Sequence, residues 1–170
     1  MGDNAYGSFA LASGTWTYTL DQSAVQDLDA GDLVNDAITY TATDGSTQQI
    51  TVTITGTDDA SVITGTVAGA VNEGNLGDTV TATGSIAITD ADDDDSPVFN
   101  DVGSTVGDNA YGSFALSSGT WTYTLDQTTV QDLDAGDLVN DTITYTATDG
   151  STQQILSLIH ISEPTRPSVI

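Results

Sequence analysis

The chain has 170 residues, of which 25 are Asp or Glu, one is Lys or Arg and none is Cys, giving a formal net charge of −24. Because phosphate groups and anionic lipids are bound by basic side chains, this charge excludes nucleic-acid partners, and we expect no membrane insertion. The absence of Cys excludes disulfides and thiol chemistry. A hydrophobic fraction of 38% together with 29 Thr is typical of a folded, strand-rich protein rather than of a disordered acidic chain.

The first predicted strands alternate between apolar residues and Thr. In residues 15–20 a Trp, a Tyr and a Leu alternate with three Thr, and residues 37–43 and 50–55 repeat this pattern. Such period-two alternation predicts strands with one face in a core and the other in water. Between the last two segments, Asp44-Gly45 predicts a tight turn.

The remaining segments carry weaker patterns. Residues 26–35 predict a loop or one helical turn, and residues 62–71 and 80–89 predict two further strands. No long amphipathic helix is expected. The sequence therefore predicts an all-β fold of antiparallel β-sandwich units, with seven strands in each complete unit.

An internal repeat sets the organisation of the chain. Residues 2–50 recur at 107–155 with four changes in 49 positions, an offset of 105 residues. This period fits one β-sandwich of ~100 residues. We therefore expect tandem units: residues 1–60 as the C-terminal half of a repeat whose N-terminal half is truncated, and residues 61–155 as a second repeat that lacks its native closing strand.

Residues 156–170 do not continue the repeat. The first copy continues TVTITGTDDA after Ile50, whereas residues 156–166 read LSLIHISEPTR, which resembles the translation of a transposase-type sequencing adapter. We interpret this segment as a non-native tail whose single His and Arg carry no function. If it pairs into the sheet, Ser157 takes the inward place of Val52, and a one-residue slip would bury the two Leu instead, so we expect an ambiguous register.

Carboxylates gather in four places. The groups are Asp90, Asp92, Asp93, Asp94 and Asp95; Asp27, Asp29 and Asp32 with their copies Asp132, Asp134 and Asp137; Asp58 and Asp59; and Glu73. The first group begins with a D-x-D pattern, but Asp95 stands where an EF-hand loop needs Gly, so we expect no EF-hand. Asp93 and Asp95 are expected to face solvent. Carboxylate oxygens without neighbouring His or Cys favour Ca2+ over zinc or copper.

Three motifs in order, YGSFALASGTWTYTLD, DLDAGDLVNDAITYTATDGS and ITVTITGTDDASVITG, resemble the VCBS repeats of giant bacterial RTX-type surface adhesins. The resemblance covers residues 1–155. It implies an Ig-like, cadherin-like β-sandwich that binds calcium at the junction of neighbouring repeats. The chain departs from the family at two points, because Gly31 replaces the Glu of the acidic loop motif and Ser61 replaces the Pro that usually follows the linker acids.

The resemblance also implies a set of calcium ligands. The linker acids, the D-x-D pair, an Asp-Gly turn and the acidic loop would serve one junction, whereas Glu73 would serve the next. Asp32 would substitute for the missing Glu, and Asp134 is the copy of Asp29. The expected ligands are Asp29, Asp32, Asp58, Asp59, Asp90, Asp92, Asp149, Glu73 and Asp134.

These features predict a structural function. We expect a calcium-stiffened spacer of a giant secreted or surface-anchored bacterial adhesin, active in cell adhesion or biofilm formation, monomeric, and with neighbouring repeats as partners. One alternative is a module of such an adhesin that binds a glycan or another cell through Trp16, Trp121 and the Tyr rings. Another is a non-catalytic appendage of a secreted hydrolase. No nucleophile motif is present, and no enzymatic activity is expected. The adhesive target is not predicted.

Overall fold

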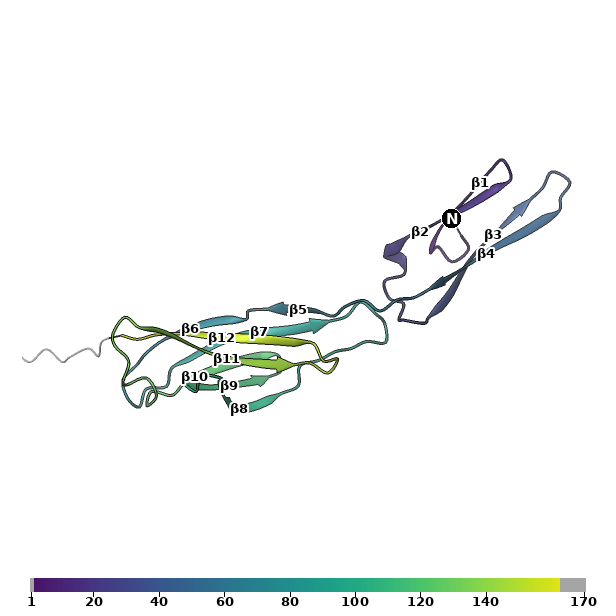
Figure 1. Ribbon diagram of the computed structural model, residues 1–170. Coiled ribbons are helices and arrows are strands. Elements are labelled where there is room, and N and C mark those ends of the chain that lie inside the picture. Colours follow the sequence, from purple (N-terminus) through teal and green to yellow (C-terminus); the bar gives the residue numbers. More distant parts are fainter. Residues whose placement is uncertain (1, 163–170) are drawn as a thin grey trace, which may run out of the picture. The chain divides into compact units, whose positions relative to one another are not determined.

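The computed structural model describes residues 2–162, which divide into two compact units (Figure 1). Of the described residues, unit 1 comprises 2–60 and 90–96, and unit 2 comprises 61–89 and 97–162. Strands dominate both units, so the predicted all-β fold class is confirmed. No helix among the described residues is long and apolar enough to cross a membrane.

Unit 1 consists of two β-hairpins, each an antiparallel pair of strands. Ser13 and Gly14 join the first hairpin and have φ values of 50° and 80°, the positive pair that a type I′ turn requires. Asp44 and Gly45 lie in the turn of the second hairpin, as predicted. The elements are β1 (Gly7–Ala12), β2 (Thr15–Leu20), the 3-10 turn η1 (Gln22–Ala24), β3 (Leu33–Thr41) and β4 (Thr47–Thr55).

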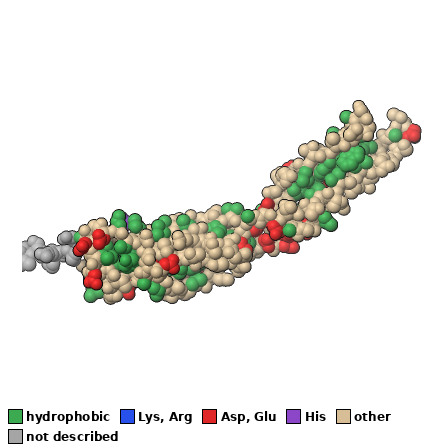
Figure 2. Space-filling view, in the orientation of Figure 1, with side chains coloured by type: hydrophobic (Ala, Val, Ile, Leu, Met, Phe, Trp, Pro, Cys, Tyr) green, Lys and Arg blue, Asp and Glu red, His purple; other side chains and the backbone are tan. Residues whose placement is uncertain are grey.

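The apolar face of these hairpins is only partly covered. Trp16 is 43% exposed and Leu11 is 51% exposed. The ring of Phe9 lies 6.4 Å from that of Trp16 and 4.7 Å from that of Tyr18, measured between centroids. Figure 2 shows the resulting continuous hydrophobic surface on unit 1.

A buried aspartate ties the two hairpins of unit 1 together. Asp36 of β3 is fully buried and accepts hydrogen bonds from the backbone N of Asn4 at 3.1 Å and from Tyr18 Oη at 3.0 Å. Burial opposes its charge, but the hydrogen bonds outweigh burial and hold the pKa of Asp36 below its usual range. Unit 2 repeats this arrangement, with Asp141 fully buried and bonded to the backbone N of Asn109 at 2.9 Å.

Unit 2 is a β-sandwich of a five-stranded and a three-stranded sheet (Figure 1). The first sheet has the order β5-β7-β10-β9-β8 and the second the order β11-β12-β6, in which β6 runs parallel to β12. The other pairs are antiparallel. The strands are β5 (Val62–Gly65), β6 (Ala68–Asn72), β7 (Thr81–Thr89), β8 (Val102–Val106), β9 (Gly112–Ser117), β10 (Thr120–Leu125), β11 (Leu138–Thr146) and β12 (Thr152–His160).

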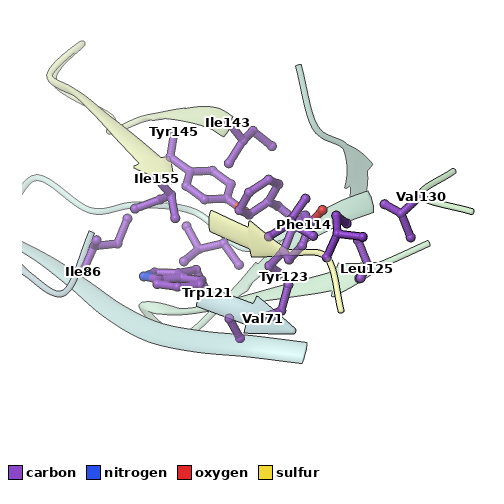
Figure 3. Packing of buried hydrophobic residues seen from close by; sticks show 14 residues of the cluster. Val71, Ile86, Phe114, Trp121, Tyr123, Leu125, Val130, Ile143, Tyr145 and Ile155 are labelled. Carbon is purple, nitrogen blue, oxygen red and sulfur yellow. The ribbon is translucent and has the colours of Figure 1, made fainter. Parts of the chain in front are cut away.

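Aromatic side chains form the centre of the unit 2 core (Figure 3). Phe114, Trp121 and Tyr123 are fully buried, and the ring centroids of Phe114 and Tyr123 lie 4.6 Å apart. Each such side chain removes ~150–250 Å² from water, so these three supply much of the hydrophobic stabilisation. Trp121 is also fixed in orientation, because its Nε1 donates to the carbonyl oxygen of Thr66 at 2.6 Å.

Two segments depart from the predicted strand pattern. The segment predicted as one strand over residues 62–71 forms β5 and β6 in different sheets, and the described part of unit 2 has eight strands instead of seven. Gly65 has a φ of 134°, and a Cβ there would collide with the carbonyl oxygen of Ser85, so only glycine allows the chain to change sheets at this point. In unit 1, β3 begins at Leu33, earlier than the alternation predicted.

The closing strand of unit 2 includes part of the unusual C-terminal segment. β12 extends to His160, and Ile155, Ser157 and Ile159 all face inward and are fully buried. This is the register expected from the first copy, and the slipped register with Leu inside is not found in the described residues. Ser157 Oγ is buried without a hydrogen-bond partner, so the strand closes the sheet with an unsatisfied hydroxyl. Residues 163–170, with the predicted tail's Arg166, lie outside the described residues.

Candidate metal centre

Three loops of unit 1 meet beyond the ends of its strands. The loops are residues 25–32, 56–60 and 90–96. Gly56 permits the close approach of the first two loops, because a Cβ at this position would collide with the carbonyl oxygen of Asp29. The backbone N of Gly56 also donates to the carbonyl oxygen of Asp32 at 2.9 Å. This glycine therefore fixes the loop that carries Asp29 against the end of β4.

Hydrogen bonds hold the third loop against the other two. The backbone N of Asp93 donates to the carbonyl oxygen of Asp27 at 3.2 Å. The backbone N of Asp59 donates to Asp92 Oδ2 at 2.7 Å. Within the third loop, the backbone N of Asp92 donates to Asp90 Oδ1 at 3.2 Å. Residues 90–96 are thus bonded to both of the other acidic loops.

The carboxylates of Asp29, Asp92 and Asp95 form a cluster at this meeting point. One oxygen of each lies within 4.8 Å of the others. Calcium binds oxygen at ~2.3–2.6 Å, so two ligands on opposite sides of one ion lie ~4.6–5.2 Å apart. The three carboxylates are therefore close enough to share a single calcium ion.

Asp92 is the member of the cluster whose carboxylate is most buried and least satisfied by hydrogen bonds. Its side chain is 3% exposed; Oδ2 accepts the bond from Asp59, whereas Oδ1 is buried without a hydrogen-bond partner. Leaving a buried polar atom unpaired costs ~1–3 kcal/mol and more for a charged group, so native proteins satisfy such atoms with a donor, a water or an ion. Residues 1–155 contain no Lys, Arg or His. The donor set therefore fits a bound cation.

The carboxylates around Asp29 also repel one another. Desolvation, followed by the charges of the surrounding carboxylates, raises the pKa of Asp29 above its usual range. Those carboxylates belong to Asp94, Asp92, Asp32 and Asp95. A divalent cation held among them would remove this repulsion and favour the charged form of Asp29.

The other predicted ligands of unit 1 lie in the same loops. Asp58 Oδ1 accepts a hydrogen bond from the backbone N of Ala30 at 3.0 Å, beside Asp29. The backbone N of Asp32 donates to the carbonyl oxygen of Asp29 at 3.0 Å. Together with Asp59 and Asp90, these residues hold the loops from which the cluster is built.

Three predicted ligands belong to unit 2 and are not members of the cluster. Asp149 accepts a hydrogen bond from Ser61 Oγ at 2.6 Å, and this bond is the main cause that lowers the pKa of Asp149. Glu73 and Asp134 take part in hydrogen bonds within unit 2. As calcium ligands these three residues stay predictions.

Asp95 is the cluster member that the sequence pattern missed. Like Asp93 it is exposed, as expected. Its backbone N donates to the carbonyl oxygen of Asp92 at 3.3 Å. This turn brings the Asp95 carboxylate back beside Asp92. The i, i+3 spacing of the two residues was the available signal, because a tight turn brings such positions together.

Comparisons with known proteins return no family. No protein-family model and no curated protein matches the sequence. Among solved structures, the chain is similar to part of a 1.5-MDa bacterial ice-binding adhesin studied for its retention at the host cell surface, with 16% identity and a TM-score of 0.31 over 89% of this chain and 51% of that chain. It is also similar to a Ca2+-stabilized adhesin that helps an Antarctic bacterium reach out and bind ice, with 16% identity and a TM-score of 0.27 over 96% of this chain and 42% of that chain.

The chain thus spans about half the length, or less, of these solved structures. TM-scores this low do not establish a shared fold.

Proposed function

We propose that this chain is part of a non-catalytic, calcium-binding spacer of tandem β-sandwich repeats in a large secreted or cell-surface bacterial adhesin. The observation that carries the proposal is the buried, unpaired Asp92 Oδ1 beside Asp29 and Asp95. The sequence resemblance to VCBS repeats supports the adhesin context. The partners would be neighbouring repeats, and the adhesive target is left open.

The proposed calcium site uses Asp29, Asp92 and Asp95 as direct ligands. When bound, calcium supplies two positive charges and six to eight coordination positions, more than three carboxylates fill. Asp32, Asp58, Asp59 and Asp90 lie in the same three loops, and their oxygens are the proposed source of the remaining ligands. Glu73 is proposed to serve the next junction along, and Asp134 and Asp149 stay proposed ligands outside the cluster.

The stiffening role follows from which segments supply the ligands. Residues 90–96 connect β7 to β8 of unit 2, but their contacts belong to unit 1. A ligand set shared by this segment and the other two acidic loops would join parts of the chain that are distant in sequence. Since ligation is lost when those parts separate, binding would resist their separation. Without the ion, the crowded carboxylates repel one another.

Glycan binding is the weaker candidate. Trp121 is fully buried in unit 2, and its Nε1 is occupied by the carbonyl oxygen of Thr66. The ring is therefore not available to stack on a sugar. Trp16 of unit 1 is exposed, but it has the same local sequence as the buried Trp121 and lies on an apolar face with Phe9.

Calcium titration of the whole chain tests the proposal. We expect binding by calorimetry, and a stabilisation of unit 1 of ~2.7 kcal/mol when calcium is in ~100-fold excess over Kd. Asp92→Asn should weaken calcium binding at least tenfold, because it removes a ligand charge but keeps the side-chain size. Asp93→Asn is the matched control: the same substitution in the same loop at an exposed side chain, which should change the affinity much less.

Two outcomes would contradict the proposal. Equal melting temperatures in calcium, in magnesium and in chelator would show that the chain has no stabilising calcium site. Equal losses of affinity in the two variants would mean that the net charge of the loop, and not ligation by Asp92, governs the response.

A further inference from the structure

Unit 1 and unit 2 pair nearly identical strands differently. In unit 2, β10 pairs with β7 and β12 pairs with β6. In unit 1, the equivalent strands β2 and β4 pair only within their own hairpins among the described residues. Trp16 is accordingly 43% exposed, whereas its copy Trp121 is 0% exposed; Leu11 is 51% exposed and its copy Leu116 is 2% exposed.

The covering strands of unit 2 are shaped to fit the tryptophan. A Cβ added to Gly84 of β7 would lie 2.6 Å from Trp121 Cζ2, and one added to Gly69 of β6 would lie 2.8 Å from Trp121 Cη2. The carbonyl oxygen of Thr66 accepts the indole N–H. Two glycines and one carbonyl group from residues 61–89 therefore form a slot for an indole ring.

Trp16 stands in the same local sequence as Trp121, with SGTWTYTLDQ around both. We define the open face of unit 1 by Phe9, Leu11, Trp16 and Tyr18. We propose that this open face is a binding site for a polypeptide segment with the sequence of residues 61–89, supplied by the first half of a repeat other than the one that begins at residue 61. The bound segment reproduces on unit 1 the interface that residues 61–89 already form in unit 2, so the shape and register of the complex are defined.

The register follows from the offset of 105 residues. Gly84 of the bound segment lies opposite Trp16 in an antiparallel pair with β2, as it lies opposite Trp121 in unit 2. Asn72 of the bound segment lies beside Thr55 in a parallel pair with β4, as it lies beside His160 in unit 2. Both sheet edges and the apolar surface are thereby covered at once.

Residues 61–89 of the same chain cannot occupy the open face of unit 1 in this register, because the chain between Thr55 and Val62 is too short. With Asn72 beside Thr55, Val62 would lie ten residues back along a parallel segment, ~33 Å from Thr55. Only seven residue steps separate Thr55 from Val62, and they reach ~24 Å at most. The ligand must therefore come from outside the chain's own residues 61–89, which already cover unit 2.

A synthetic peptide of residues 61–89, added to the whole chain, tests the proposal. The peptide contains no Trp, so the fluorescence of the chain reports on its own two Trp residues. Because Trp121 is already buried, a blue shift and protection from acrylamide quenching must come from Trp16. We expect saturable binding with these changes, and their loss in a Trp16→Ala chain.

Peptide variants separate specific docking from general apolar association. Gly84→Val places a side chain where the indole must lie and should weaken binding at least tenfold. Thr83→Val, which places the same Val side chain on the exposed side of β7, should leave binding within about twofold. The peptide carries only Glu73 and Asp78 as charged side chains, so repulsion from the acidic chain should weaken, and binding strengthen, as salt rises.

Three results would overturn the proposal. One is the absence of any change in Trp16 at saturating peptide. Another is an equal response to the native and Gly84→Val peptides. The third is dimerisation of the chain through Trp16 that the peptide does not dissociate, because the occupant would then be a second open face.

Discussion

The two units place the same strands in different surroundings. Residues 2–50 and 107–155 differ at four of 49 positions, but Trp16 is 43% exposed and Trp121 is 0% exposed. In both units the alternation of apolar residues and Thr forms the same hairpins with the same side chains on one face. Among the described residues, further strands pair with these hairpins only in unit 2, where β7 pairs with β10 and β6 with β12. The alternation thus determines which residues share a face, and the neighbouring strands determine whether that face is buried.

The acidic ends of the two units differ for another reason. Gly56 in unit 1 and Ile161 in unit 2 make equivalent hydrogen bonds, to the carbonyl oxygens of Asp32 at 2.9 Å and of Asp137 at 3.0 Å. A Cβ at Gly56 would collide with the loop of Asp29, whereas the Ile161 side chain is buried in unit 2. The same loop sequence therefore packs differently. The three-carboxylate cluster lies in unit 1 among the described residues, and two of its members come from residues 90–96.

The largest expected difference between the units lies at the two tryptophans. Trp121→Ala should destabilise unit 2 by ~3–5 kcal/mol, because it leaves a cavity in a packed core. Trp16→Ala should cost unit 1 less than ~1 kcal/mol, since much of the ring is already in water. Hydrogen exchange followed by mass spectrometry measures both units within one chain. Equal losses of protection would mean that the open face of unit 1 is covered in solution.

The next difference is at the closing strand, where Ser157 replaces the Val52 of the first copy. Ser157→Val should stabilise unit 2 by ~1–2 kcal/mol, because it fills an inward position and removes a buried, unpaired hydroxyl. Replacing residues 156–165 by TVTITGTDDA, the continuation of the first copy, should raise stability by more than ~1.5 kcal/mol. Denaturant unfolding of the three chains provides the measurement.

Val52→Ser in unit 1 is the matched reverse change. Val52 is half-buried, so this substitution should cost less than Ser157→Val gains. If Ser157→Val and the longer replacement leave the midpoint and slope of unfolding unchanged, residues 156–160 are a competent native strand, and the adapter interpretation loses its physical support.

Much of the fold was predictable because period-two alternation is local. It located β2 and β4 and the face that each presents, and a weaker pattern located β7. β1 and β8 were not predicted, since both are short and rich in Gly, Ala or Ser, so their strand pairing depends on neighbours. The break at Gly65 depends on a close approach to Ser85, which no local pattern records.

The candidate site was predictable only in part. Asp29 and Asp92 stood out because they lie in acidic motifs of the repeat. Asp95 did not, because its place in the cluster depends on a turn that brings its carboxylate back to Asp92. The role of Gly56 was hidden for the same reason: it acts through the space that it leaves for another loop.

The smallest expected effect is at Asp29, where the shift in melting temperature caused by Asp29→Asn should change sign when calcium is added. Its pKa is raised in the folded chain, so the native state binds a proton there more readily than the unfolded state does. The contribution of Asp29 to stability therefore falls as pH rises from its ordinary pKa of about 4 through the raised value. At pH 7 without calcium, Asp29→Asn should slightly raise the melting temperature of unit 1. With saturating calcium it should lower that temperature, because a ligand is lost.

Asp93→Asn is the control for this reversal, because Asp93 is exposed in the same group of acidic loops and is not a member of the three-carboxylate cluster. It should give a similar small shift with and without calcium. Calcium affinity of the native chain should also fall as pH falls through the raised pKa of Asp29, because a protonated carboxyl is a poor ligand. Thermal melts and calorimetric titrations between pH 4 and 7 measure both effects. If Asp29→Asn shifts the melting temperature in the same direction with and without calcium, Asp29 is not a calcium ligand, and the cluster is only a site of repulsion.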